Sequence, residues 1–138
     1  MNALKFSTGV KTFAVNDGTT EISYNPTDPL FVERMYDAFA GIAEQYEAGK
    51  GKTFADNKAF FEYARARDKE VHETVDALFG EGVSDALFEG VSSYAMADGL
   101  PLWCNFFLAV IDTVPAELST QIKATKPRVE KYLAKYHR

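Results

Sequence analysis

One group of residues in this sequence has the types, but not the spacing, of a phosphate-binding loop. Gly51-Lys52-Thr53 matches the end of such a loop, which also needs a glycine five positions before Gly51, where the chain has Tyr46. A strand should precede the loop, and the sequence here predicts a helix. We therefore interpret these glycines as a flexible connection between two helices and predict no nucleotide or other cofactor site.

Two histidines and one cysteine are the remaining candidates for metal binding or catalysis. His72 has only Asp68 and Asp76 one helical turn away, and a metal would want more ligands. We predict an exposed helical histidine and no metal site. A catalytic triad would have to use His72 or His137, and no serine or cysteine lies near His72 in sequence. The sequence therefore predicts no catalytic residues and no enzyme activity.

Cys104 lies in the apolar run from Leu102 to Leu108. A single thiol cannot form a disulfide within the chain, and we interpret it as a small buried hydrophobic residue. A small enzyme or an inhibitor protein stays open as an alternative. It would need a cleft that holds His72 with a carboxylate or with Cys104.

Length and composition indicate one globular domain spanning residues 1–138. Hydrophobic residues make up 46% and charged residues 25% of the chain, which argues against extended disorder. The N-terminus has no apolar targeting segment, and the longest apolar stretch, Leu100 to Ile111, is too short to span a bilayer. We expect a cytoplasmic protein that does not enter membranes.

The net charge of −5 conceals an asymmetry along the chain. Residues 121–138 carry six basic residues and one acidic residue, whereas residues 1–120 carry nine basic and 19 acidic residues. The basic surface is too small to predict nucleic-acid binding. Two interpretations stay open. The basic residues stabilise the C-terminal end of a helix through its dipole, or they dock on an acidic partner, which includes another copy of the chain.

The first 25 residues have a β pattern. Lys11–Val15 and Glu21–Tyr24 flank Asn16-Asp17-Gly18, a hairpin signal, because Asp and Gly tolerate the positive φ of tight turns. Lys5–Ser7 is a candidate third strand. The sequence predicts a small N-terminal hairpin within about residues 3–25, packed on helices, since a lone hairpin is marginal in water.

The rest of the chain has helical periodicity, so the predicted fold class is mainly α (α+β), with about five helices. Pro29 begins the first helix, Ser84 caps the third and Thr113 caps the last, which Pro127 kinks or splits. The segment from Pro101 is apolar on nearly every side, so it should be the most buried element. The expected helical ranges are 29–49, 55–79, 84–90, 94–97, 101–112 and the segment from 113 onward.

The most distinctive segment is Met96–Asn105. One interpretation makes it a helix N-terminus with Trp103 as a core anchor. The alternative is that Trp103, Phe106 and Phe107 include an exposed hot spot for a partner helix. Candidate interface residues are therefore Trp103, Phe106, Phe107, Tyr132 and Tyr136.

The order of motifs resembles a family of small phage and prophage proteins from Gram-positive hosts, similar to tail-assembly chaperones of long-tailed phages. The resemblance covers nearly the whole chain. It is carried by Asn25-Pro26-Thr27-Asp28-Pro29-Leu30-Phe31-Val32-Glu33-Arg34, Val75-Asp76-Ala77-Leu78-Phe79-Gly80, Ala97-Asp98-Gly99-Leu100-Pro101-Leu102-Trp103-Cys104-Asn105 and Lys131-Tyr132-Leu133-Ala134-Lys135-Tyr136-His137.

The resemblance implies a non-enzymatic helical chaperone. It would bind the long helical tape-measure protein, keep that protein soluble and bring in tail-tube subunits. The family implies no catalytic residues. The alternative that shares the same resemblance is a structural tail-completion or connector protein of the phage particle, whose hairpin adds to a partner's sheet edge.

Overall fold

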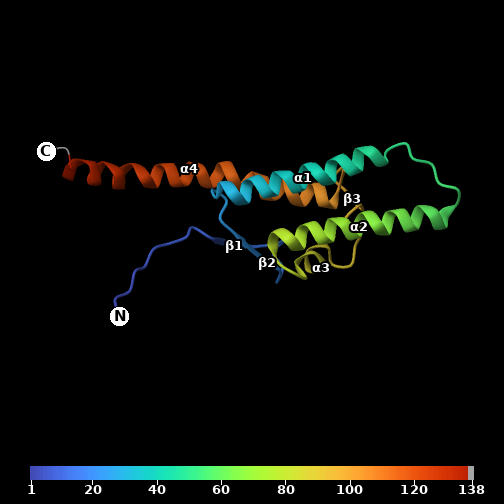
Figure 1. Ribbon diagram of the computed structural model, residues 1–138, viewed down its shortest axis with the longest axis horizontal. Coiled ribbons are helices and arrows are strands. Elements are labelled where there is room, and N and C mark those ends of the chain that lie inside the picture. The colour runs from blue at the N-terminus through green and yellow to red at the C-terminus, as the bar shows by residue number, and fades with distance from the viewer. Residues whose placement is uncertain (137–138) are drawn as a thin grey trace.

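Residues 1–136 form four helices and two small antiparallel hairpins (Figure 1). The computed structural model describes this range, apart from the side chains of residues 125–130 and 132–136. The predicted mainly helical fold with an N-terminal hairpin is confirmed. The described residues contain four helices rather than about five.

The N-terminal hairpin pairs β1 (Lys11–Ala14) with β2 (Glu21–Tyr24). Asn16 and Asp17 in the connecting turn have φ of 52° and 56°, the left-handed values that short polar residues tolerate. The predicted third strand at residues 5–7 is wrong. Phe6 is 85% exposed, so no apolar burial offsets the entropy cost of ordering this segment.

Helices α1 (Pro29–Gly49) and α2 (Asn57–Phe79) lie close to their predicted ranges. Asp28 caps α1 by accepting a hydrogen bond from the Leu30 amide at 3.0 Å, and Pro29 occupies the first turn. Asp56 caps α2 by accepting from the Ala59 amide at 2.8 Å. Gly49 ends α1, and Gly51 lies in the connection between the two helices, as predicted.

Between α2 and the last helix, the predicted short helix near residues 84–90 is present, but its predicted cap and the next expected helix are wrong. Helix α3 (Val83–Phe88) begins after Gly82, which has no side chain to cap it, and Ser84 is buried instead of capping. The expected helix at 94–97 is a second hairpin, β3 (Met96–Ala97) with β4 (Leu100–Pro101). Asp98 and Gly99 both have positive φ, the geometry that a two-residue turn requires.

Helix α4 (Leu102–Tyr136) is one continuous helix of 35 residues. The sequence predicted one helix to residue 112 and a new one from Thr113, split or kinked at Pro127. Pro115 is exposed, and a proline on an exposed helix face removes one backbone bond without ending the helix. Thr113 lies inside the helix and donates its hydroxyl to the Val110 carbonyl rather than capping a new segment.

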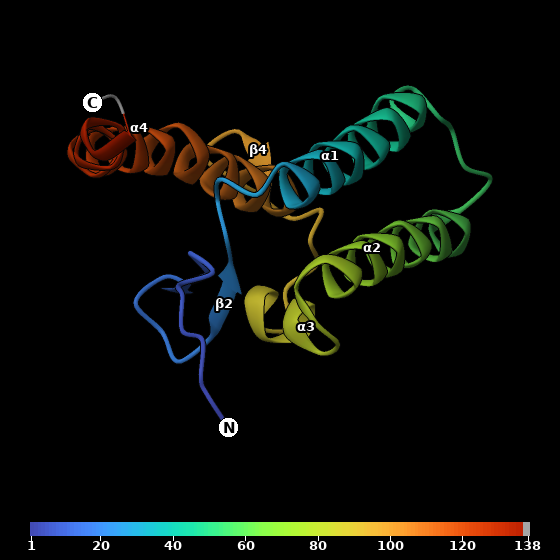
Figure 2. The same cartoon turned by 60° about the vertical axis from the view of Figure 1, so that its left-hand side comes forward.

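The core lies where α1, α2 and the first turns of α4 meet the hairpin. Its buried side chains come from all of these elements and from α3: Ile22, Tyr24, Phe31, Met35, Ile42, Val71, Val75, Leu87, Phe88, Trp103, Phe107 and Val110. The start of α4 is buried on one stripe rather than on nearly every side, since Leu108 is 38% exposed. Figure 2 shows α3 beside the end of α2, on the same side as β2.

The second half of α4 projects away from this body (Figure 1). Residues 118–124 are all exposed, and the ion pair between Lys11 and Glu117 at 2.9 Å is the last polar contact from α4 to another element among the described side chains. At 1.5 Å per residue the helix is about 52 Å long. The free end of α4 and the α1–α2 connection lie at opposite ends of the long axis (Figure 1).

We expect Phe107→Ala to lower the free energy of unfolding by about 3–5 kcal/mol, because it leaves a cavity among three helices. Phe107 is 0% exposed. Leu108→Ala, one residue further along the same helix, is the matched control and should cost less than about 1 kcal/mol. Urea denaturation of the three proteins measures both values, and equal midpoints would contradict this account of the core.

Candidate functional site

His72 of α2 takes part in a polar cluster that joins α2 to α3. Its Nδ1 lies 2.8 Å from the Ser84 hydroxyl and 3.2 Å from an Asp85 oxygen, and its Nε2 lies 3.5 Å from an Asp68 oxygen. Its side chain is 23% exposed. The prediction of an exposed histidine is therefore wrong, because α3 folds back over this face of α2.

Ser84, His72 and Asp68 contact one another in the sequence of a catalytic triad, but the burial of Ser84 does not suit catalysis. The Ser84 side chain is 1% exposed, so its hydroxyl cannot reach a substrate. Asp68 accepts hydrogen bonds from both the amide and the hydroxyl of Ser93, at 2.8 and 2.6 Å. The cluster thus connects α2 to α3 and to the loop after α3, which gives each buried polar group a partner.

Asp76 fixes the start of α3 from the other side. Its carboxylate accepts a hydrogen bond from the Ser84 amide at 2.8 Å. Partial burial raises the pKa of Asp76, but hydrogen bonds from Ser84 and Gly82 and the neighbouring His72 outweigh burial. The net pKa is lower than that of an ordinary aspartate.

Cys104 and the glycine-rich connection do not form reactive sites. Burial raises the pKa of the Cys104 thiol, which disfavours the nucleophilic thiolate. Lys52 lies over the Tyr63 ring, 4.9 Å from its centre. Among the side chains that the structure describes, no three of the His, Cys, Asp and Glu types come together in a way that could hold a metal ion. His137 lies outside the described residues.

The five predicted interface residues differ in how far their side chains are buried. Trp103 and Phe107 are 2% and 0% exposed and belong to the core, so the exposed hot spot is wrong at these two positions. Phe39 packs against both rings at 5.8 and 5.7 Å. Phe106 is half-buried and reaches a groove. Tyr132 and Tyr136 are part of α4, but their side chains lie outside the described residues.

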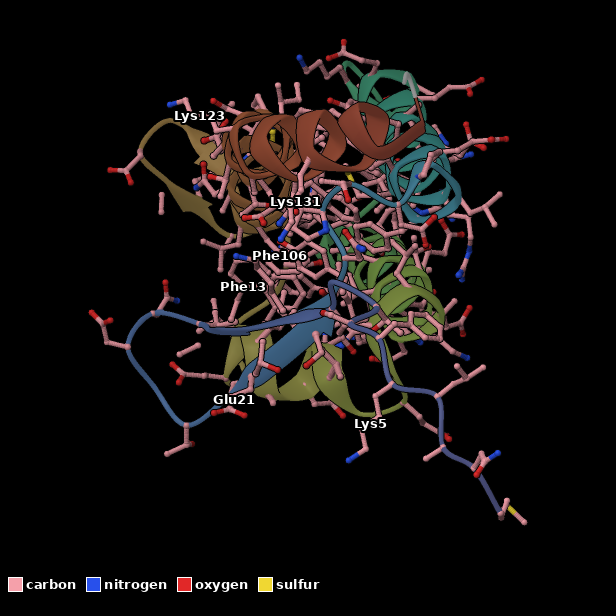
Figure 3. All side chains as sticks on the ribbon, turned by 90° about the vertical axis from the view of Figure 1, so that its left-hand side faces the viewer. Lys5, Phe13, Glu21, Phe106, Lys123 and Lys131 are labelled. Carbon is pink, nitrogen blue, oxygen red and sulfur yellow. The ribbon has the colours of Figure 1, made fainter. Side chains whose placement is uncertain are left out.

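We call the hollow beside Phe106 the Phe106 groove. It consists of two cavities of about 320 and 200 Å³ that adjoin along α4 and share Val15, Asn16, Phe106 and Ala109. Figure 3 shows Phe13 of the hairpin and Phe106 of α4 in the space between these two elements. The other lining residues are Phe13, Ala14, Ile22, Tyr24, Leu87, Phe88, Glu89, Val91, Leu102, Asn105, Val110 and Thr113.

Three elements hold the Phe106 groove in shape. Phe106 packs edge-on against Phe79 and Phe88, at 5.5 and 6.4 Å between ring centres. Tyr24 fixes the hairpin side through a 2.9 Å hydrogen bond to the Thr113 hydroxyl. Burial raises the pKa of Tyr24, and the bond to Thr113 lowers it by a smaller amount, so the hydroxyl stays neutral.

The lining of the Phe106 groove is mainly apolar. Most of its lining is aliphatic or aromatic, and Ala109 at its centre is exposed and small. The side-chain amide nitrogen of Asn105 donates one of its two hydrogens to the Ala97 carbonyl at 2.9 Å. A groove of this kind accepts apolar side chains that a helix presents at successive turns.

The comparisons with known proteins give no further guide. No family model, curated protein or solved structure matches the chain. In the part of the chain that the structure describes, no helix is long and apolar enough to cross a membrane.

Sequence reasoning found Phe106 but missed the rest of the groove. The hairpin turn, α3 and α4 are far apart in sequence, and no periodicity connects them. The available signal was Ala109, a small residue that lies at helical spacing from Leu102 and Phe106 on the same side of the helix.

The Asp76 contact gives a pH prediction. Because the folded pKa lies below the unfolded value of about 3.9, this stabilisation is complete above pH 5 and is lost as the pH falls through the folded pKa. The urea midpoint of Asp76→Ala should therefore lie below that of the wild type at neutral pH, and the difference should shrink as the pH falls below about 3.9. Asp112→Ala, at an exposed site outside both grooves, is the control. A difference that stays constant with pH would rule out this role.

Proposed function

We propose that this protein is a non-enzymatic phage tail-assembly chaperone that binds the tape-measure protein and helps to recruit tail-tube subunits. The observation that carries the proposal is the Phe106 groove, an apolar hollow bordered by two helices and a hairpin turn. The motif order that resembles the phage family supplies the identity of the partner.

The groove suits a helical partner in its shape and chemistry. A tape-measure protein is long and helical, so it exposes apolar side chains until it is enclosed in the tail. Binding those side chains in an apolar groove removes them from water, which is the physical basis of a chaperone's solubilising effect. Phe106 lies at the centre of the groove and presents one face to it.

A second candidate is a structural tail-completion or connector protein. The N-terminal segment favours it, because Leu4 and Phe6 are 96% and 85% exposed and residues 1–10 pair with no strand. An extended apolar segment of this kind can add to the sheet edge of a partner. Mass spectrometry of purified particles separates the two functions, since a chaperone is absent from the finished tail and a connector is present.

Ala109→Glu tests the chaperone function at the groove. A carboxylate at this exposed position introduces a charge into the apolar contact without removing core packing, so binding should weaken about tenfold to hundredfold. We expect co-expression of the wild type with the tape-measure protein from the same genome to raise the amount of soluble tape-measure protein. Ala109→Glu should lose most of this effect.

Ala48→Glu is the matched control, because it makes the same substitution at an exposed position of α1 outside the groove. It should behave like the wild type in pull-down and solubility assays. No complex and no solubility gain with the wild type would refute the chaperone function. Full activity of Ala109→Glu would refute the role of the Phe106 groove but would leave the chaperone function standing.

A further inference from the structure

A second groove runs between α1 and α2, on surfaces that the Phe106 groove does not use. It consists of two cavities of about 240 and 190 Å³, which share Gln45 of α1 and Tyr94 from the loop after α3. Arg67 of α2 spans it, donating to Gln45 at 2.7 Å and pairing with Glu70 at 2.6 Å. We call it the α1–α2 groove.

The two ends of the α1–α2 groove differ in character. The end near the α1–α2 connection is aromatic, with Tyr46, Phe60 and Tyr63 in its wall, and Phe60 is 46% exposed. At the other end Asp37 of α1 lines the wall without an ion-pair partner among the described side chains, whereas Glu70 of α2 is neutralised by Arg67. The groove therefore fits a helix that carries both apolar and basic side chains.

Further acidic residues extend the negative charge along α1. Glu33 and Glu44 lie four residues before and seven residues after Asp37, so the three fall on one side of the helix, and all three are exposed. Among the described side chains, none of these three carboxylates has an ion-pair partner. Their negative potential is thus available to a basic partner.

The projecting part of α4 has the complementary properties. Leu118 and Ile122 lie one turn apart and are 43% and 69% exposed. Lys123 and Lys131 are exposed on the same projecting part (Figure 3), and the sequence of residues 121–138 has a net charge of +5. A helix without packing partners is marginal in water, so this segment gains stability from any surface that covers it.

The complementary surfaces cannot meet within one molecule, because α4 projects from one end of the long axis and the aromatic end of the groove lies at the other (Figure 1). We propose that the projecting part of α4 docks in the α1–α2 groove of a second copy of this chain. The contact joins two different surfaces of the same protein, so it repeats and generates a head-to-tail assembly. It does not rest on the proposed function, since it uses neither the Phe106 groove nor a phage partner.

Paired charge reversals test this contact in the full-length chain. Asp37→Lys with Glu44→Lys reverses two charges on α1, one in the groove and one on the same side of the helix, and Lys123→Glu with Lys131→Glu reverses two charges on the projecting part of α4; all four positions are exposed. Each double variant alone should sediment as a monomer under low-salt conditions in which the wild type forms larger species. An equimolar mixture of the two should assemble again, because each reversed surface then meets its opposite.

Analytical ultracentrifugation of the wild type and variants gives the mass distribution directly. The wild-type assembly should dissociate as the ionic strength rises to about 1 M, where screening extends over only about 3 Å. Ala109→Glu should assemble like the wild type, which keeps this result separate from the test of the Phe106 groove. A wild-type monomer at about 100 µM, well above a micromolar Kd, would overturn the proposal. Unchanged assembly of either reversal variant, or no recovery in the mixture, would also overturn it.

Discussion

The fold depends on one buried stripe of α4, formed by Trp103, Phe107 and Val110, which fills the space beside α1 and α2. Phe39 of α1 packs edge-on against the rings of Trp103 and Phe107. Helix α1 contacts both α2 and α4, whereas α2 packs mainly against α3. The α1–α2 groove therefore runs along a direct contact between its two helices.

Tyr24 joins the hairpin to both α1 and α4 of this body. Tyr24 stacks on Phe13 within the hairpin and on Phe31 of α1, at 4.8 and 4.7 Å, and its hydroxyl meets Thr113 of α4. Since the Phe106 groove has its walls on both sides of this junction, its width depends on the same contacts. The position of the hairpin is thus set by side-chain packing rather than by strand pairing with the rest of the chain.

The sequence predicted the long elements well because their signals are local. Asp28-Pro29 marks the start of α1, and the spacing of Phe31, Met35 and Ile42 marks its buried face. The errors came where a local signal competed with a tertiary one. The sequence predicted a helix at 94–97, although Asp98-Gly99 has the same hairpin chemistry that identified the first turn. It also predicted a new helix from Thr113, although α4 continues through Pro115.

The surfaces were harder to predict than the fold. Nothing in the local sequence distinguishes Phe106, which lines a groove, from Phe107, which is fully buried, because the difference is one helical step of about 100°. Likewise, Ser84 lies 12 residues from His72, so their contact depends on how α3 folds back on α2. Charge asymmetry was visible from the sequence, but its meaning depended on α4 projecting rather than folding back.

Helix α4 is one geometric element with two different stabilities. The backbone amides near Phe107 and Val110 are held by the core, so their hydrogen exchange requires unfolding of the whole domain. The amides near Ile122 are held only by the helix itself, and fraying from the free end exposes them without disturbing the core. In an isolated molecule, a steep gradient of exchange rates should therefore run along a single uninterrupted helix, with its steepest part just after Val114.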